Sequence, residues 1–221
     1  MSYQTPCTVA VVTGGHSYDV PNFHRLFRSL DGVEAYIQGM DDFASSSREV
    51  REEYEVVLLY IMLGPVPSDE GLPWHAGKPR TALEELGETA QGIVVLHHAL
   101  LAYPEWPVWA ELVGLPDRSF GYHIGETVRT EIALPEHPIT QGLAPWTMVD
   151  ETYAMADADE ASPVLLTYDH PKSMRTIAWT RQYRRSRVFC YEAGHDNATW
   201  PDPNFREVLR RGILWAAGRL G

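Results

Sequence analysis

The sequence predicts an α/β fold built on a doubly wound, mostly parallel sheet with helices on both faces. Short apolar runs rich in Val, Ile and Leu recur through the first hundred residues, as in strands buried on both faces. Between them, apolar residues recur at helical spacing, which is typical of crossover helices. No linker or repeat divides the 221 residues. We therefore expect a single domain over residues 1–221.

The first half of the chain alternates strands and helices. The run at 8–13 predicts a buried strand, and Phe23, Leu26, Phe27 and Leu30 form one face of the helix that follows. This order implies right-handed crossovers in one sheet. The other elements expected here are a strand at 33–37, a short helix from Ser47 to 53, strands at 55–63 and 93–96, and a helix at 80–88.

The segment 64–79 interrupts this alternation. It contains four prolines and several glycines, so we expect a loop. A loop of this length is more often functional than accidental. Three roles remain open for it: a lid, an arm that contacts a second copy, or an inert insertion.

The second half of the chain is richer in strands. Residues 126–134 alternate like an exposed strand, and the acidic segment 150–153 is expected to precede another strand. The arginine-rich run 181–187 lies between two expected strands and reads as a solvated hairpin. Further strands are expected at 164–168, 175–179 and 187–191, with a closing amphipathic helix at 203–217.

Composition limits the classes of partner. The net charge of −12 argues against nucleic acid, because phosphate binding needs clustered Lys and Arg. No apolar run approaches the length of a membrane helix and the N-terminus has no signal-peptide pattern. Cys7 and Cys190 lie in or beside apolar strands and are expected to be free thiols. These features favour the cytoplasm. The many tryptophans make self-association plausible without setting its stoichiometry.

Three strand ends carry histidine, and we expect them to meet. His97 and His98 end the central strand, His16 follows Gly14-Gly15, and His195 precedes Asp196. Ligands of open parallel sheets bind at the carboxyl ends of the strands. Histidine there is suited to acid/base catalysis or metal ligation. The sequence does not decide which of the paired histidines faces the cleft, although His98 is preferred.

Several established chemistries are excluded by missing motifs. The chain has no GxGxxG or Walker sequence, no GxSxG elbow, and too few cysteines for a Cys-rich zinc site. Neither cysteine occupies a catalytic position. A site made of histidines and carboxylates remains, for which zinc is the favoured divalent metal.

Taken in order, these motifs resemble the trehalose-utilisation (ThuA-like) family. The resemblance covers nearly the whole chain and is carried by the Gly14-Gly15-His16 turn with Asp19, GIVVLHHAL at 92–100, Trp109, Gly114, Phe120, His123, HPITQGL at 137–143, DETY at 150–153, GHDNATW at 194–200 and the final helix. It implies a flavodoxin-like fold similar to class I glutamine amidotransferases. In those enzymes the elbow after the central strand holds a nucleophilic Cys, whereas this chain has histidines there, so we do not expect a glutaminase.

The resemblance implies a role in carbohydrate metabolism, on trehalose, related glycosides or their oxidised forms. One hypothesis is an enzyme of this class acting on a small sugar, with His98, His195, Asp196 and Glu151 as catalytic groups. The alternative is a non-catalytic sugar-binding or regulatory protein on an amidotransferase-like scaffold. The residues expected to line the pocket are Gly15, His16, Asp19, His97, His123, Tyr153 and Trp200. The residues expected to hold a divalent metal, if one binds, are His16, His98 and His195.

Overall fold

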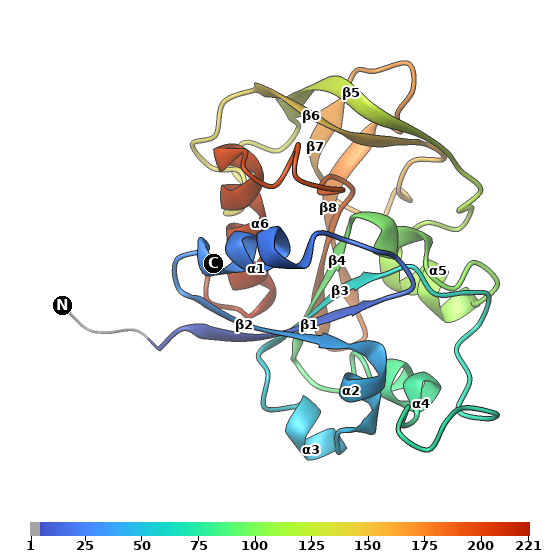
Figure 1. The fold of residues 1–221 in the computed structure, drawn as a ribbon. Coiled ribbons are helices and arrows are strands. Elements are labelled where there is room, and N and C mark those ends of the chain that lie inside the picture. The colour runs from blue at the N-terminus through green and yellow to red at the C-terminus, as the bar shows by residue number, and fades with distance from the viewer. Residues whose placement is uncertain (1–4) are drawn as a thin grey trace.

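The protein is built around one mixed sheet of nine strands in the order β2-β1-β3-β4-β9-β8-β7-β5-β6 (Figure 1). The computed structural model describes residues 5–221. This mixed α/β architecture agrees with the fold class predicted from the sequence. The sheet has a parallel half, β2 to β9, and an antiparallel half, β8 to β6.

The parallel half forms the centre of the core. The side chains of β3 and β4 are buried along their whole length, as expected of Val- and Leu-rich strands covered on both faces. All five strands point the same way, so their carboxyl ends form one edge of the sheet. In sheet order they are β2 (Val33–Gly39), β1 (Cys7–Gly14), β3 (Val56–Ile61), β4 (Gly92–Leu96) and β9 (Ser186–Tyr191).

The antiparallel half contains one departure from the sequence-based assignment. The acidic segment 150–153 lies inside a strand and not before one, because β6 spans Trp146–Ala154 and pairs with β5. The alternation of exposed and buried residues along β6 is interrupted at 150–153, where all four residues are buried, and this hid the strand. The other strands of this half are β8 (Thr176–Tyr183), β7 (Val164–Tyr168) and β5 (Gly121–Ile132).

Helices cover both faces of the parallel half. In Figure 1, α1 and α6 lie together on one side of the sheet and α2 to α5 on the other. Helix α6 packs closely, since a Cβ on Gly212 would lie 2.1 Å from the Phe189 ring of β9. Among the described residues, no helix has the length and apolarity needed to cross a membrane. The helices are α1 (Val20–Arg28), α2 (Met40–Ser45), α3 (Arg48–Arg51), α4 (Pro79–Glu84), α5 (Pro107–Val113) and α6 (Pro203–Ala216).

The antiparallel half folds back over the carboxyl ends of the parallel strands. In a flat sheet, β6 would lie about 24 Å from β4, five strand spacings away. Instead, a side chain of β6 lies 3.5 Å from the residue that follows β4. The two halves therefore meet above the edge where the strands predict a site.

Candidate functional site

His97 forms a sharp elbow directly after β4. Its φ of +53° is unusual for a residue other than glycine, and such strain tends to occur at functional sites. A short 3₁₀ helix, η1 (His97–Leu101), begins at this residue. The side chain is fully buried. Its Nδ1 donates to the Glu192 carbonyl at 2.6 Å, and its Nε2 lies 2.8 Å from the Tyr153 hydroxyl oxygen, within hydrogen-bond distance.

His97, Glu151 and His195 come together from three segments, and we call them the His–Glu–His cluster. Glu151 lies between the two rings: His97 Nε2 is 3.5 Å from Oε1, and His195 Nε2 is 3.6 Å from Oε2. The three potential ligand atoms all lie within 4.8 Å of one another. His195 is the partly exposed member, so it connects the cluster to solvent.

Glu151 is held in its ionised form. Burial favours the neutral acid, but the hydrogen bond and charge of His97, together with His195, outweigh burial and lower the pKa of Glu151. A carboxylate therefore stands between two imidazoles at neutral pH. This arrangement can accept a proton, stabilise positive charge on either ring, or bind a cation.

Two buried acids, Asp150 and Glu192, hold the backbone around the cluster. Asp150 accepts the N–H groups of Gly194 (2.8 Å) and His195 (3.1 Å), which fixes the loop after β9. Glu192 accepts the Tyr153 N–H at 2.9 Å. Burial raises the pKa of Asp150 and raises that of Glu192 well above its usual value, with the Asp150 charge adding to the second shift. These acids act as backbone anchors.

His98 and His16 pack beside the cluster. Their rings stack with centroids 4.5 Å apart, and the His16 ring is 5.8 Å from that of His195. Both nitrogens of His98 are buried without a hydrogen-bond partner among residues 5–221. Burial, with the charges of neighbouring histidines, lowers the pKa of His98 to about 2, so this ring is neutral. The predicted ligand set of His16, His98 and His195 thus shares only His195 with the set that converges.

Two residues expected to line the pocket have other roles. Asp19 does not orient His16; it caps α1 by accepting the Asn22 N–H and also binds the Asn197 amide. Trp200 is buried, with 2% of its surface exposed, and donates to the Gly194 carbonyl at 2.8 Å. It therefore supports the His195 loop from the core and does not line a cleft.

The remaining predicted residues differ in their distance from the cluster. Asp196 contacts His195, with Oδ2 3.2 Å from Nδ1. Tyr153 contacts His97 as described. His123 lies on β5 opposite Thr152 and outside the group of converging ligand atoms. Gly15 adopts a φ of +75°, and a Cβ there would lie 2.2 Å from the Met62 carbonyl oxygen, so only glycine fits this turn.

The cluster fits a divalent metal by its donor chemistry. Two imidazoles and one carboxylate form a common catalytic zinc set. The Nδ1 atom of His97 contacts a backbone carbonyl, and that of His195 contacts Asp196. Such contacts at the second ring nitrogen orient histidines that bind a metal. Both Nε2 atoms face Glu151. For a metal to bind His97, the Tyr153 hydroxyl must release Nε2.

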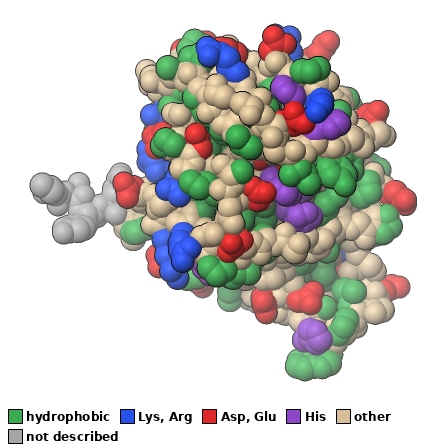
Figure 2. All heavy atoms as spheres, turned by 45° about the horizontal axis from the view of Figure 1, so that its top comes forward, with side chains coloured by type: hydrophobic (Ala, Val, Ile, Leu, Met, Phe, Trp, Pro, Cys, Tyr) green, Lys and Arg blue, Asp and Glu red, His purple; other side chains and the backbone are tan. Residues whose placement is uncertain are grey.

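A cavity of about 600 Å³ lies next to the cluster, and we call it the loop cavity. It is bounded by the ends of β1 and β2 and by the loop 64–79, and Gly15, the neighbour of His16, lines it. Figure 2 shows histidines gathered in the middle of this face beside hydrophobic side chains. The sequence did not indicate the cavity, and it missed Glu192 and Tyr103. Of these residues, only Glu192 could have been noticed in the sequence, because it is an acid directly after a buried strand.

Comparison with known proteins gives one family. The family model ThuA, described as trehalose utilisation, matches residues 49–216. The search of curated proteins returned no significant match.

Solved structures show the same fold. A ThuA-like protein from Parabacteroides merdae aligns with a TM-score of 0.72 at 18% identity, covering 97% of this chain and 91% of its own. One from Bacteroides uniformis gives 0.72 at 18% identity, with 98% and 94% covered. A cytoplasmic protein from Salmonella typhimurium gives 0.67 at 13% identity, with 94% and 98% covered.

Proposed function

Because the chain belongs to the ThuA (trehalose utilisation) family, we propose that it is an enzyme of carbohydrate metabolism that acts on trehalose or a related glycoside or sugar derivative. Its reaction centre is the His–Glu–His cluster, assisted by a divalent metal, with zinc favoured. The reaction class is hydrolysis or isomerisation. In keeping with a solved relative titled a cytoplasmic protein and with two buried free thiols, we place the activity in the cytoplasm.

The convergence of His97, Glu151 and His195 within 4.8 Å supports this proposal most strongly. Packing alone gives no reason to bury a carboxylate between two imidazoles, because desolvation of charged groups is costly. The anchors Asp150 and Glu192 hold the backbone around the cluster. Perturbed titratable groups held in this way are typical of functional sites.

The members of the cluster divide the chemistry. His195 is the partly exposed imidazole and transfers protons between the substrate and solvent. Glu151, kept ionised, stabilises the charge that develops on His195, with Asp196 on the other side of the ring. His97 is fixed by Glu192 and Tyr153 and presents Nε2. When bound, a divalent ion supplies polarisation of a substrate oxygen.

Cysteine chemistry has no place in this site. Cys190 is buried inside β9 and Cys7 begins β1. Burial raises the pKa of both thiols, that of Cys7 to about 11, so neither is a nucleophile at neutral pH. His97 occupies the elbow where related amidotransferases carry their cysteine. This substitution favours the second candidate, a sugar-binding protein without catalysis.

Elemental analysis of protein purified without chelators or a His-tag tests the cluster. We expect about one zinc or similar ion per chain in the wild type and loss of the metal in His97→Ala. Glu151→Gln, which retains the shape of the side chain, serves in case His97→Ala fails to fold. His98→Ala is the matched control, because it removes the neighbouring imidazole, which the sequence favoured as a ligand.

The outcomes separate the hypotheses. Metal retained in His97→Ala and Glu151→Gln but lost in His98→Ala would favour the ligand set predicted from sequence. Turnover of trehalose or its oxidised forms that persists in Glu151→Gln and His195→Ala would contradict the proposed reaction centre. Saturable sugar binding with no product under any metal condition would establish the non-catalytic alternative.

A further inference from the structure

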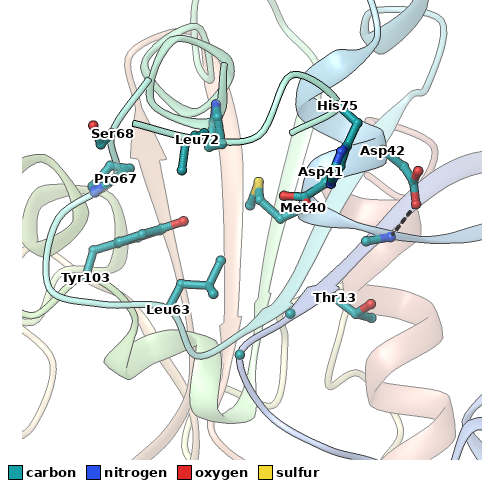
Figure 3. A pocket seen from close by; sticks show the side chains of 14 residues that line it. Thr13, Met40, Asp41, Asp42, Leu63, Pro67, Ser68, Leu72, His75 and Tyr103 are labelled. Atoms are coloured by element: carbon teal, nitrogen blue, oxygen red, sulfur yellow. Dashed lines mark hydrogen bonds between the residues drawn. The ribbon is translucent and has the colours of Figure 1, made fainter. Parts of the chain in front are cut away.

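The loop cavity is large enough for a ligand beyond the group that reacts at the His–Glu–His cluster. Its volume of about 600 Å³ lies within the range of small-molecule sites, roughly 300–1,000 Å³. Figure 3 shows side chains from both sides pointing into it. It lies at the same edge of the sheet as the cluster: Gly15 lines the cavity, and the next residue, His16, packs toward His98 and His195.

Tyr103 brings a polar group into the cavity. Only 3% of its surface is exposed, and its hydroxyl points into the cavity (Figure 3) without a hydrogen-bond partner among residues 5–221. Burial raises the pKa of this hydroxyl, so it stays neutral. The hydroxyl oxygen is not among the buried side-chain atoms that lack a partner in residues 5–221, so it is open to the cavity and available to a ligand. A ligand that both donates and accepts hydrogen bonds, such as another hydroxyl, satisfies it.

The backbone holds Tyr103 in this position. Its φ is +47°, and its N–H donates to the Leu63 carbonyl at 2.6 Å. Its own carbonyl accepts from Arg118 at 2.7 Å. The hydroxyl is thus fixed in advance of binding, which reduces the entropy lost when a ligand is bound.

The charge of the lining indicates the class of ligand. Asp41 and Asp42 lie on one side of the cavity, His75 is the one basic side chain of the lining, and no Lys or Arg is among the lining residues. The first turn of α2 does not offer a free anion site, because Asp42 already accepts the Gly39 N–H at 3.4 Å (Figure 3). Phosphates and carboxylates, which need positive partners, are therefore disfavoured. The apolar part of the lining, Leu63 and Leu72, suits the C–H faces of a sugar ring.

We propose that the loop cavity is a subsite for an uncharged second sugar unit of the substrate, recognised by the Tyr103 hydroxyl and Asp41. This proposal rests on the proposed sugar substrate and deepens it. The substrate class becomes an unphosphorylated disaccharide or larger glycoside, with one unit at the His–Glu–His cluster and the next under the loop 64–79. Tyr103 and Asp41 select this substrate and take no part in the bond changes.

Calorimetry with trehalose and glucose tests the subsite. We expect the wild type to bind the disaccharide more tightly than the monosaccharide. Tyr103→Phe removes only the hydroxyl and should weaken trehalose binding about three- to tenfold while leaving glucose binding unchanged. Tyr183→Phe is the matched control: it too removes a tyrosine hydroxyl, one that has no hydrogen-bond partner among residues 5–221, but this hydroxyl lies at the β8–β9 hairpin, at the opposite ends of the parallel strands.

A second pair of variants fills the cavity without touching the core. Leu72 lines the cavity and is 41% exposed, so Leu72→Trp is accommodated and should weaken trehalose binding at least as much as Tyr103→Phe. Val66 lies on the same loop, is 36% exposed and does not line the cavity. Val66→Trp should therefore bind trehalose like the wild type.

The results distinguish failure of the subsite from failure of the proposed function. Unchanged trehalose affinity in both Tyr103→Phe and Leu72→Trp would overturn the subsite, even if Glu151→Gln abolishes turnover. Weakened binding in those variants supports the subsite, even if Glu151→Gln remains active and the reaction centre fails. Tighter binding of trehalose 6-phosphate than of trehalose would overturn the uncharged class. No binding of either sugar by the wild type would overturn the subsite and the sugar substrate together.

Discussion

The His–Glu–His cluster and the loop cavity share one edge of the sheet but differ in how their polar groups are satisfied. In the cluster, His97 is held at both ring nitrogens and Glu151 lies between two imidazoles. In the loop cavity, the Tyr103 hydroxyl points into the cavity and Asp41 is exposed. The polar groups of the cluster contact one another, whereas those of the loop cavity are available to a ligand.

This difference separates two tasks that active sites combine. A reaction centre must hold its groups within tenths of an ångström before the substrate arrives, which internal hydrogen bonds achieve. A recognition site must leave its groups free for the ligand. Gly15 lines the loop cavity and directly precedes His16, which packs toward the cluster.

The same chemical change should have very different effects in the two regions. Glu151→Gln removes the charge between two imidazoles, and we expect kcat to fall by about 10²- to 10⁴-fold. Asp41→Asn removes an exposed charge in the loop cavity and should raise KM by less than about tenfold with little change in kcat. Steady-state kinetics on the sugar that is turned over measures both. Equal losses of kcat would show that the two regions are not distinct.

Two glycines with left-handed φ values provide a stability comparison. A Cβ at Gly15 (φ +75°) would meet the Met62 carbonyl, whereas at Gly71 (φ +70°), on the loop 64–79, it would meet nothing within 4 Å. Gly71→Ala should cost about 1–2 kcal/mol, the penalty of the backbone conformation alone. Gly15→Ala should cost about 3 kcal/mol or more. Urea unfolding measures both, and similar values would mean that Met62 moves away readily.

Two aspartates that anchor backbone should respond oppositely to pH. Asp69 accepts the Arg80 and Thr81 N–H groups and ties the loop 64–79 to α4. Although its slight burial opposes ionisation, hydrogen bonds from Thr81 and Arg80 lower its pKa. Its contribution is therefore present above the unfolded value near 3.8 and is lost as the pH falls through the lower folded pKa. Asp150 is fully buried, and burial raises its pKa, so folding favours its protonated form as the pH falls.

The free energy of unfolding of Asp69→Asn and Asp150→Asn against pH measures these two responses. The difference in the free energy of unfolding between the wild type and Asp69→Asn should disappear as the pH falls below 3.8. The advantage of the wild type over Asp150→Asn should grow as the pH falls toward 4, since protonation relieves the buried charge. If the difference from the wild type changed with pH in the same direction for both variants, burial could not be the cause of the raised pKa of Asp150.

Periodicity predicted the fold well because it reflects burial. The strand positions of the first half followed from apolar spacing, whereas α2 was not predicted and β6 was missed at 150–153, where all four residues are buried. Asp19 was expected to line the pocket, yet it precedes Val20-Pro21, a pattern typical of helix starts.

The candidate site was only partly predictable. The meeting of His97, Glu151 and His195 follows from strand ends and an acidic segment that the sequence displays. The choice of His97 over His98 depends on the +53° φ at the elbow, which no residue spacing reveals. The loop cavity depends on how the loop 64–79 packs, and Tyr103 carries no local signal. These features arise from tertiary packing.

The folding back of the antiparallel half also has a consequence for how the protein folds. His97, Glu151 and His195 lie far apart along the chain, and Glu151 reaches His97 only after β6 has closed over the strand ends. Contacts of such long range form slowly, because the loop-closure entropy is lost before they are made. The three groups of the proposed reaction centre therefore assemble late, so during refolding any activity of the cluster should return after the fluorescence of a core tryptophan outside the antiparallel half, such as Trp109. Activity thus reports the completed fold.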